Sequence, residues 1–187
     1  MNKELIFTDS IDYIQKKIKT ILSQIPHNDI EKLKALFLKS NRIFVYGAGR
    51  SGLVAKAFAI RLVHLGFQTF VIGETITGPV QKGDLVIIVS GSGETIPAVM
   101  TAEIAQNLEA KVVSITGKKN SEIAKYADIT LFISASCNDI ERKKYAPLGT
   151  LFEASVWVLF DGLIADLLDS KNENEESMRS RHATVEQ

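Results

Sequence analysis

The sequence is poor in cysteine and has no excess of either charge, and both absences exclude classes of protein. Cys137 is the single cysteine, so the chain cannot form an internal disulfide or a CxxC metal or redox site. There are 22 Lys and Arg residues against 22 Asp and Glu residues, whereas a broad nucleic-acid binder needs a basic excess. No apolar run reaches the roughly 18–20 residues that span a bilayer. We therefore expect neither nucleic acid nor a membrane as a partner.

The composition is otherwise that of an ordinary globular protein. The 187 residues are 45% hydrophobic and 24% charged. A chain of this length forms one domain, and we assign residues 1–187 to it. The first residues lack the basic, apolar and small-residue pattern of a secretory signal peptide, so we expect the protein in the cytoplasm.

The chain divides into three parts by its hydrophobic patterns. In residues 1–40, apolar side chains recur at helical spacing over 11–25, after capping residues at 8–10, and over 30–37. Residues 41–169 alternate short, continuous apolar runs with helix-like segments. The runs are 43–46, 70–72, 85–89, 112–115 and 129–133, and the helix-like segments are 53–65, 96–108 and 121–126. This alternation predicts an α/β/α sandwich around a parallel sheet, whose ligands bind at the carboxyl ends of the strands.

The second part ends with a helix that is apolar on nearly every side, over residues 150–168. Such a helix is buried, and in a chain of this size we expect it to contribute to a subunit interface as well as to the core. A polar linker follows at 171–177. The tail, 170–187 when the linker is included, ends with a charged run around His182.

Two loops rich in glycine and serine carry the chemical signal. Gly47–Gly52 and Ser90–Thr95 each follow an apolar strand and precede a helix. Glycines let the backbone approach a ligand, and the first amides of a helix have no internal partners and carry a partial positive charge. The repeated arrangement predicts an anion site built without a lysine.

The first loop alone is ambiguous. It matches G-x-G-x-x-G, and Glu74 follows at a distance typical of dinucleotide sites. A dinucleotide site, a phosphate site and a structural turn are therefore all compatible with it. The second loop is not predicted by a dinucleotide site and favours a sugar phosphate. Neither loop fits the G-x-x-x-x-G-K-[ST] pattern of nucleotide hydrolysis.

Several stretches together resemble the sugar isomerase (SIS) domain family. They are GAGRSG at 47–52, GETIT at 73–77 and SGSGET at 90–95. Three more narrow the resemblance to the 6-phospho-3-hexuloisomerases: AFAIRLVHLG at 57–66, APLGTLFE at 146–153 and MRSRHATVE at 178–186. The likeness covers nearly the whole chain. The tail departs from the family at Thr184 and Val185, where Asn and Leu are usual.

The resemblance implies a five-stranded parallel sheet, a homotetramer and no metal or organic cofactor. It also implies interconversion of D-arabino-hex-3-ulose 6-phosphate and D-fructose 6-phosphate in the ribulose monophosphate pathway of formaldehyde fixation. Such a reaction moves a proton between neighbouring carbons through an enediol. The protein must supply a phosphate anchor, a base and stabilisation of the enediolate.

The loops supply the expected phosphate anchor. We assign it to hydroxyls and loop glycines, namely Ser51, Ser90, Ser92, Thr95, Gly49, Gly91 and Gly93. The alternative is that the same hydroxyls merely cap the following helices. Arg50 could bind the substrate or form a surface ion pair, and Glu74 and Thr75 are candidates for contacts with the sugar hydroxyls.

Glu153 is the candidate base, because it lies in the first turn of an otherwise apolar helix. The alternative is a capping box with Thr150, whose T-x-x-E pattern fits. Glu94 is a rival base. His182 is the candidate proton shuttle or ring-opening acid, delivered to a neighbouring subunit; alone, a tail histidine is more often solvated. We expect Cys137 to be a bystander.

Two other functions remain open from the sequence. One is a related isomerase acting on a pentose or heptose phosphate. The other is a non-catalytic regulator that binds a sugar phosphate through the same serines. The presence of both Glu153 and His182 favours an enzyme, since a pure binder needs neither.

Overall fold

Five parallel strands form one sheet, as expected, and their order in it is β2-β1-β3-β4-β5. The structure is a computed structural model that describes residues 5–134 and 137–183. The strands are β1 (Ile43–Gly47), β2 (Thr69–Val71), β3 (Leu85–Ser90), β4 (Lys111–Thr116) and β5 (Ile129–Phe132). All six residues of β3 are buried, because β3 lies between two neighbouring strands and both of its faces are covered.

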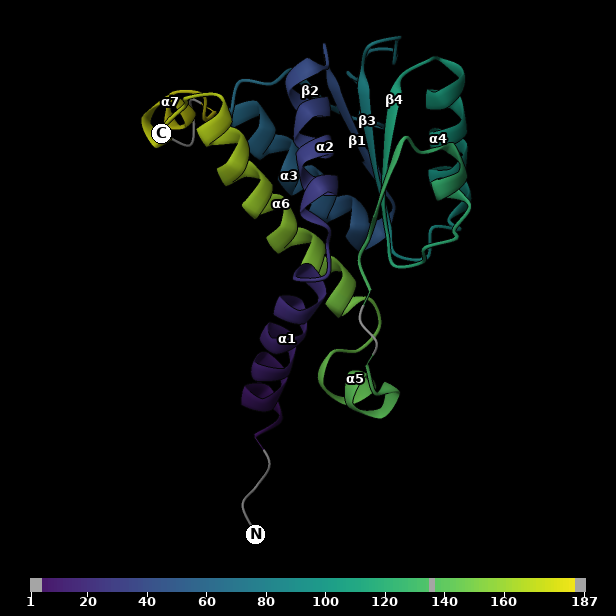
Figure 1. Ribbon diagram of the computed structural model, residues 1–187, viewed down its shortest axis with the longest axis vertical. Coiled ribbons are helices and arrows are strands. Elements are labelled where there is room, and N and C mark those ends of the chain that lie inside the picture. Colours follow the sequence, from purple (N-terminus) through teal and green to yellow (C-terminus); the bar gives the residue numbers. More distant parts are fainter. Residues whose placement is uncertain (1–4, 135–136, 184–187) are drawn as a thin grey trace.

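Helices cover both faces of the sheet (Figure 1). One face packs against α2 (His27–Lys39), α3 (Gly49–His64) and α6 (Thr150–Ser170), and the other against α4 (Ile96–Asn107) and the 3₁₀ helix η1 (Ile123–Tyr126). Successive strand residues alternate between these cores: Val45 and Ile87 face α3 and α6, whereas Phe44 and Val86 face α4. The predicted three-layer α/β/α architecture is confirmed.

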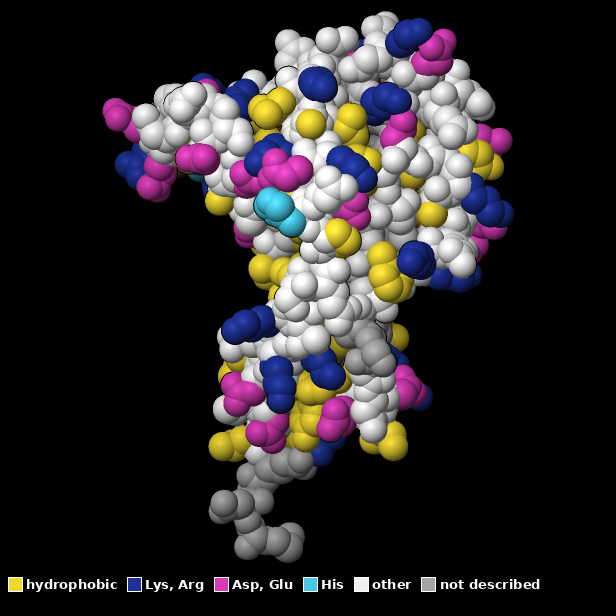
Figure 2. Space-filling view, viewed as in Figure 1, with side chains coloured by type: hydrophobic (Ala, Val, Ile, Leu, Met, Phe, Trp, Pro, Cys, Tyr) yellow, Lys and Arg dark blue, Asp and Glu magenta, His cyan; other side chains and the backbone are white. Residues whose placement is uncertain are grey.

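Two helices extend beyond the carboxyl edge of the sheet. They are α1 (Ile6–Leu22) and α5 (Asp139–Tyr145), which pack against each other below the body of the protein in Figure 1. Apolar side chains lie among the charged ones on this projection (Figure 2). Phe7 is 79% exposed and Ile140 is 78% exposed.

The structure corrects three local expectations. Helix α1 begins at Ile6, so residues 8–10 lie inside it and do not cap it. The linker expected at 171–177 contains the start of a short helix, α7 (Glu175–Arg179), which begins because Asn174 and Ser177 form a capping box. Helix α5 was not predicted at all. It begins at Asn138, whose side chain accepts hydrogen bonds from the amides of Ile140 and Glu141.

The turn between β1 and α3 depends on two glycines in close contact. A Cβ at Gly52 would lie 2.5 Å from the backbone oxygen of Gly47, and a Cβ at Gly47 would lie 2.8 Å from the nitrogen of Gly52. The first and third glycines of the G-x-G-x-x-G pattern therefore let a helix start directly against a strand. They serve backbone packing and leave only the middle glycine free to face a ligand.

We predict that Gly52→Ala lowers the free energy of unfolding by about 1–3 kcal/mol, because the clashing atom is backbone and cannot rotate away. Urea unfolding measures this. The control is Gly162→Ala in α6, where a Cβ meets nothing within 4 Å; it should stabilise by about 0.5–1 kcal/mol. An equal change in the free energy of unfolding of the two variants would contradict the close contact between Gly47 and Gly52.

Candidate functional site

The two glycine-serine loops lie side by side at the carboxyl edge of the sheet. Strands β1 and β3 are neighbours, and Gly47 pairs with Val89 at their carboxyl ends. After β1 the chain runs outward to β2 and then returns to β3 on the opposite side of β1. Such a reversal of strand order opens a crevice at the carboxyl ends, where ligands of open α/β sheets bind.

The first loop presents an open backbone at Gly49. Its φ is +56°, a conformation that favours glycine, and a Cβ there would meet nothing within 4 Å. Gly49 starts α3, whose N-cap Ala48 offers no side-chain cap. The first amides of α3 are thus left for a ligand. Arg50 is exposed and Ser51 is buried in this first turn.

The second loop gathers three hydroxyls, those of Ser90, Ser92 and Thr95, which we call the hydroxyl cluster. The Thr95 Oγ1 lies 3.3 Å from the Ser90 Oγ and 3.5 Å from the Ser92 Oγ. The amide of Gly93 donates to the Ser90 Oγ at 3.1 Å. Thr95 is the N-cap residue of α4, but its hydroxyl makes no capping hydrogen bond. The Thr95 hydroxyl therefore does not cap α4, whereas the Ser90 and Ser92 oxygens accept from the loop amides of Gly93 and Glu94. The three hydroxyls lie close enough together to contact one polyol or phosphate group.

Helix α6 brings Glu153 to the first loop. The Arg50 Nε donates to the Glu153 Oε2 at 2.6 Å, and the Glu153 side chain is 13% exposed against 68% for Arg50. The capping-box alternative is wrong: the N-cap is Gly149, and the Thr150 hydroxyl donates to the Pro147 oxygen. The Glu153 carboxylate therefore takes no part in capping α6.

The same helix also contacts the second loop. The ring of Phe152 lies against Gly91, where a Cβ would come within 3.2 Å of it. The first turn of α6 thus contacts both loops: Glu153 contacts the first loop and Phe152 the second. Sequence reasoning missed Phe152, since no motif distinguishes it from the other apolar residues of α6.

A hollow of about 470 Å³ opens beside Glu153. Its walls come from α1, α3 and α6, and they are mostly apolar apart from Arg50, Thr150 and Glu153. Leu53 is 64% exposed, Trp157 48% and Val158 46%. An apolar wall of this kind suits another protein surface better than a sugar.

The remaining carboxylates of the site are tied to lysines. Glu74 follows β2 and accepts a hydrogen bond from Lys56 at 2.5 Å, and the neighbouring Thr75 is exposed. Glu94 accepts one from Lys118 at 2.7 Å. This hydrogen bond lowers the pKa of Glu94, which makes that carboxylate a poorer proton acceptor. Both candidate bases therefore have a cationic partner, and they differ in burial: the Glu153 side chain is 13% exposed and the Glu94 side chain 39%.

His182 lies far from Glu153 within the chain. Its ring stacks on His64 with centroids 3.9 Å apart, and Arg181 donates to the His64 oxygen at 2.9 Å. His64 ends α3, whose 16 residues span roughly 24 Å from the first loop. Figure 1 shows α7 at this opposite end. The structure does not bring the two candidate catalytic residues together in one chain, and Thr184 and Val185 lie outside the described residues.

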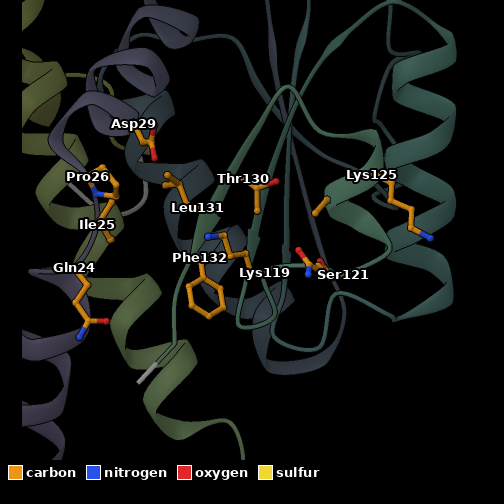
Figure 3. Close-up of a pocket in the computed structure, with 12 residues that line it drawn as sticks. Gln24, Ile25, Pro26, Asp29, Lys119, Ser121, Lys125, Thr130, Leu131 and Phe132 are labelled. Atoms are coloured by element: carbon orange, nitrogen blue, oxygen red, sulfur yellow. The ribbon is translucent and has the colours of Figure 1, made fainter. Parts of the chain in front are cut away.

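A second hollow, of about 640 Å³, lies along β5 (Figure 3). Gln24 and Asp29 line it on one side and Lys119, Ser121 and Lys125 on the other. None of the predicted site residues lines it.

Within residues 5–134 and 137–183, no group of three or more His, Cys, Asp or Glu residues could hold a metal ion. No helix there has both the length and the apolar character needed to cross a membrane.

The fold and both loops define the class of protein. Residues 36–159 match the SIS domain family, and the chain belongs to it. It is 37% identical to the 3-hexulose-6-phosphate isomerase of Bacillus subtilis, over 96% of this chain and 98% of that protein. It is 35% identical to the 3-hexulose-6-phosphate isomerase of Methylomonas aminofaciens, over 94% of this chain and 97% of that protein.

A solved structure agrees with these relatives. A Methanococcus jannaschii protein, whose crystal structure infers a molecular function of 3-hexulose-6-phosphate isomerase, superposes with a TM-score of 0.84. That protein is 30% identical, and the match covers 94% of this chain and 98% of the other. Within the SIS domain proteins, this chain is therefore an isomerase of the 3-hexulose-6-phosphate isomerase family.

We predict that Thr95→Val weakens binding of fructose 6-phosphate about tenfold or more, because a hydrogen bond to a charged phosphate is lost from the hydroxyl cluster. Isothermal titration calorimetry measures the Kd. Thr101→Val is the matched control, since the Thr101 hydroxyl on the same helix donates to the Pro97 oxygen. An unchanged Kd in Thr95→Val would show that the phosphate binds elsewhere.

Proposed function

We propose that this isomerase interconverts D-arabino-hex-3-ulose 6-phosphate and D-fructose 6-phosphate, in the ribulose monophosphate pathway of formaldehyde fixation. The similar proteins named 3-hexulose-6-phosphate isomerase support the substrate. The observation that carries the reaction is the Glu153 carboxylate, 2.6 Å from Arg50 and next to the open loop at Gly49. A base beside an anion site is the arrangement that proton transfer on a sugar phosphate requires.

The proposed reaction moves one proton between neighbouring carbons. Glu153 accepts the proton from C2 of the 3-ketose, and the electrons of that C–H bond form the double bond of a 2,3-enediolate. The protonated Glu153 then returns the proton to C3, while the proton of the C2 hydroxyl passes to the oxygen on C3. The carbonyl ends at C2, no electron leaves the substrate, and Glu153 regains its charge.

The loops hold and stabilise the reacting sugar in this scheme. The phosphate binds the hydroxyl cluster, Ser51 and the amides of Gly49, Gly91 and Gly93, at the N-termini of α3 and α4. Arg50 is exposed enough to turn from Glu153 towards the enediolate or the phosphate, where its charge counts most. Glu74 and Thr75, at the adjacent end of β2, contact the sugar hydroxyls.

We also infer that the site is completed by a neighbouring subunit of a homotetramer. Leu53, Trp157 and Val158 expose an apolar surface directly beside Glu153. A second copy covering that surface would exclude water from the base. His182 lies at the other end of α3 from its own site, so its role as proton shuttle or ring-opening acid belongs to a neighbour's site.

A coupled assay tests the proposed function. Fructose 6-phosphate is supplied to the purified protein together with a 6-phospho-3-hexulose lyase, and formaldehyde release is measured. Release that depends on the protein is the expected result. No release at any enzyme concentration, with fructose 6-phosphate still bound, would favour the regulator instead, and turnover of a pentose or heptose phosphate would favour a related isomerase.

We predict that Glu153→Gln lowers kcat at least 10³-fold while the Kd of fructose 6-phosphate stays within about twofold, since the amide keeps the shape but cannot accept the proton. Glu103→Gln, an exposed change on α4, is the control and should keep full activity. Full activity in Glu153→Gln would eliminate Glu153 as the base.

Mixing two inactive variants tests the neighbour's contribution. We predict that Glu153→Gln and His182→Ala, each nearly inactive alone, recover part of the wild-type kcat after joint unfolding and refolding. Mixed oligomers contain sites with an intact Glu153 from one chain and an intact His182 from another. No recovery in verified mixed oligomers, or full activity of His182→Ala alone, would refute the shared site.

A further inference from the structure

Gly149, the N-cap residue of α6, has no conformational reason to be glycine. Its φ is −82° and its ψ is 5°, which alanine also adopts. Gly149 is distinguished by its neighbour, because the Glu153 carboxylate lies where a side chain at Gly149 would begin. A Cβ there would have the Glu153 carboxylate as its nearest neighbours, with Oε1 at 2.9 Å and both Cδ and Oε2 at 3.1 Å.

The Glu153 carboxylate is hydrogen-bonded to Arg50 and lies next to the Cβ position of Gly149. The Glu153 backbone is fixed, because its amide donates to the Gly149 oxygen at 3.0 Å. Its Oε2 accepts from the Arg50 Nε, and all three carboxylate atoms lie within 2.9–3.1 Å of the position that a Cβ of Gly149 would take. Adding a methyl group at Gly149 therefore displaces the carboxylate.

We propose that Gly149 is a positioning residue, whose missing side chain sets where the Glu153 carboxylate lies. This inference rests on the proposed function, in which Glu153 is the base. Gly149 differs here from Gly47 and Gly52, where a Cβ would strike backbone. At Gly149 the obstructed atoms are the end of a flexible side chain, so the fold tolerates the methyl group while the base moves. Proton transfer requires heavy atoms about 2.6–3.2 Å apart, and a displacement of about 1 Å costs on the order of 10²-fold in rate.

The first test is the kinetics of Gly149→Ala. We expect kcat to fall about 10²-fold, with KM for fructose 6-phosphate within about twofold and the same thermal unfolding temperature or a higher one. The matched control is Gly162→Ala, the same substitution on the same helix with nothing within 4 Å of the new Cβ, which should keep full activity. An unchanged kcat in Gly149→Ala, or an equal loss in Gly162→Ala, would overturn the proposal.

A double-mutant cycle separates positioning from general damage. Glu153→Asp withdraws the carboxylate by one methylene and removes the atoms that the new methyl group would strike. We therefore expect Gly149→Ala to cost less than about threefold in the Glu153→Asp background, against about 10²-fold in the wild type. Additive losses would show that Gly149 acts through something other than the carboxylate.

A spectroscopic readout distinguishes failure of this inference from failure of the proposed function. With ¹³C-labelled glutamate, the Glu153 carboxyl resonance is assigned by its loss in Glu153→Gln. It should shift in Gly149→Ala and stay in place in Gly162→Ala. A wild-type enzyme inactive on fructose 6-phosphate would refute the proposed function alone, whereas an unmoved Glu153 resonance in Gly149→Ala would refute the positioning role.

Discussion

The packing of α3 against α6 is the constraint on which the site depends. The rings of Phe58 and Phe160 stack between the two helices with centroids 3.9 Å apart and planes within 3°. Both helices begin at the carboxyl edge of the sheet, so this contact also sets their register at that edge. Arg50 and Glu153, 103 residues apart in sequence, meet as a consequence. Without the α3–α6 contact, Glu153, the proposed base, and the glycine loop would belong to separate parts of the fold.

The proposed site would let a chain with no net charge hold a phosphate. The positive potential would come from the backbone and from Arg50, since α3 and α4 both begin next to the crevice between β1 and β3 and Arg50 lies in the first turn of α3. The hydroxyl cluster adds donors that carry no formal charge. Lys56 and Lys118 are paired with Glu74 and Glu94. The absence of a basic excess therefore argues against nucleic acid but is compatible with a single phosphate in a crevice.

The sequence predicted what depends on local pattern and missed what depends on packing. The five apolar runs predicted the strands, because continuous β-branched segments are typical of a sheet buried on both faces. Helix α5 was missed although Asn138 followed by Glu141 is an N-terminal signal, since its helix is too short to show a period. The T-x-x-E pattern at Thr150 was a false signal, because the N-cap residue of α6 is Gly149 and Thr150 is the first residue of the helix. The Arg50–Glu153 contact and the space at Gly149 could not be predicted, because both require the distance between side chains.

The distribution of apolar surface connects the site with its proposed assembly. Helix α6 is apolar on nearly every side, yet Trp157 and Val158 remain about half exposed, one turn from Glu153. A base needs an environment from which water is excluded, and the single chain leaves one side of Glu153 bordered by an open apolar hollow. The tail carries His182 to the opposite end of α3, where the chain's own site cannot use it. The open apolar hollow and the distant His182 have no evident use in an isolated subunit. Both are explained by the proposed assembly, in which a neighbouring copy covers the hollow and one chain's tail reaches the other chain's site.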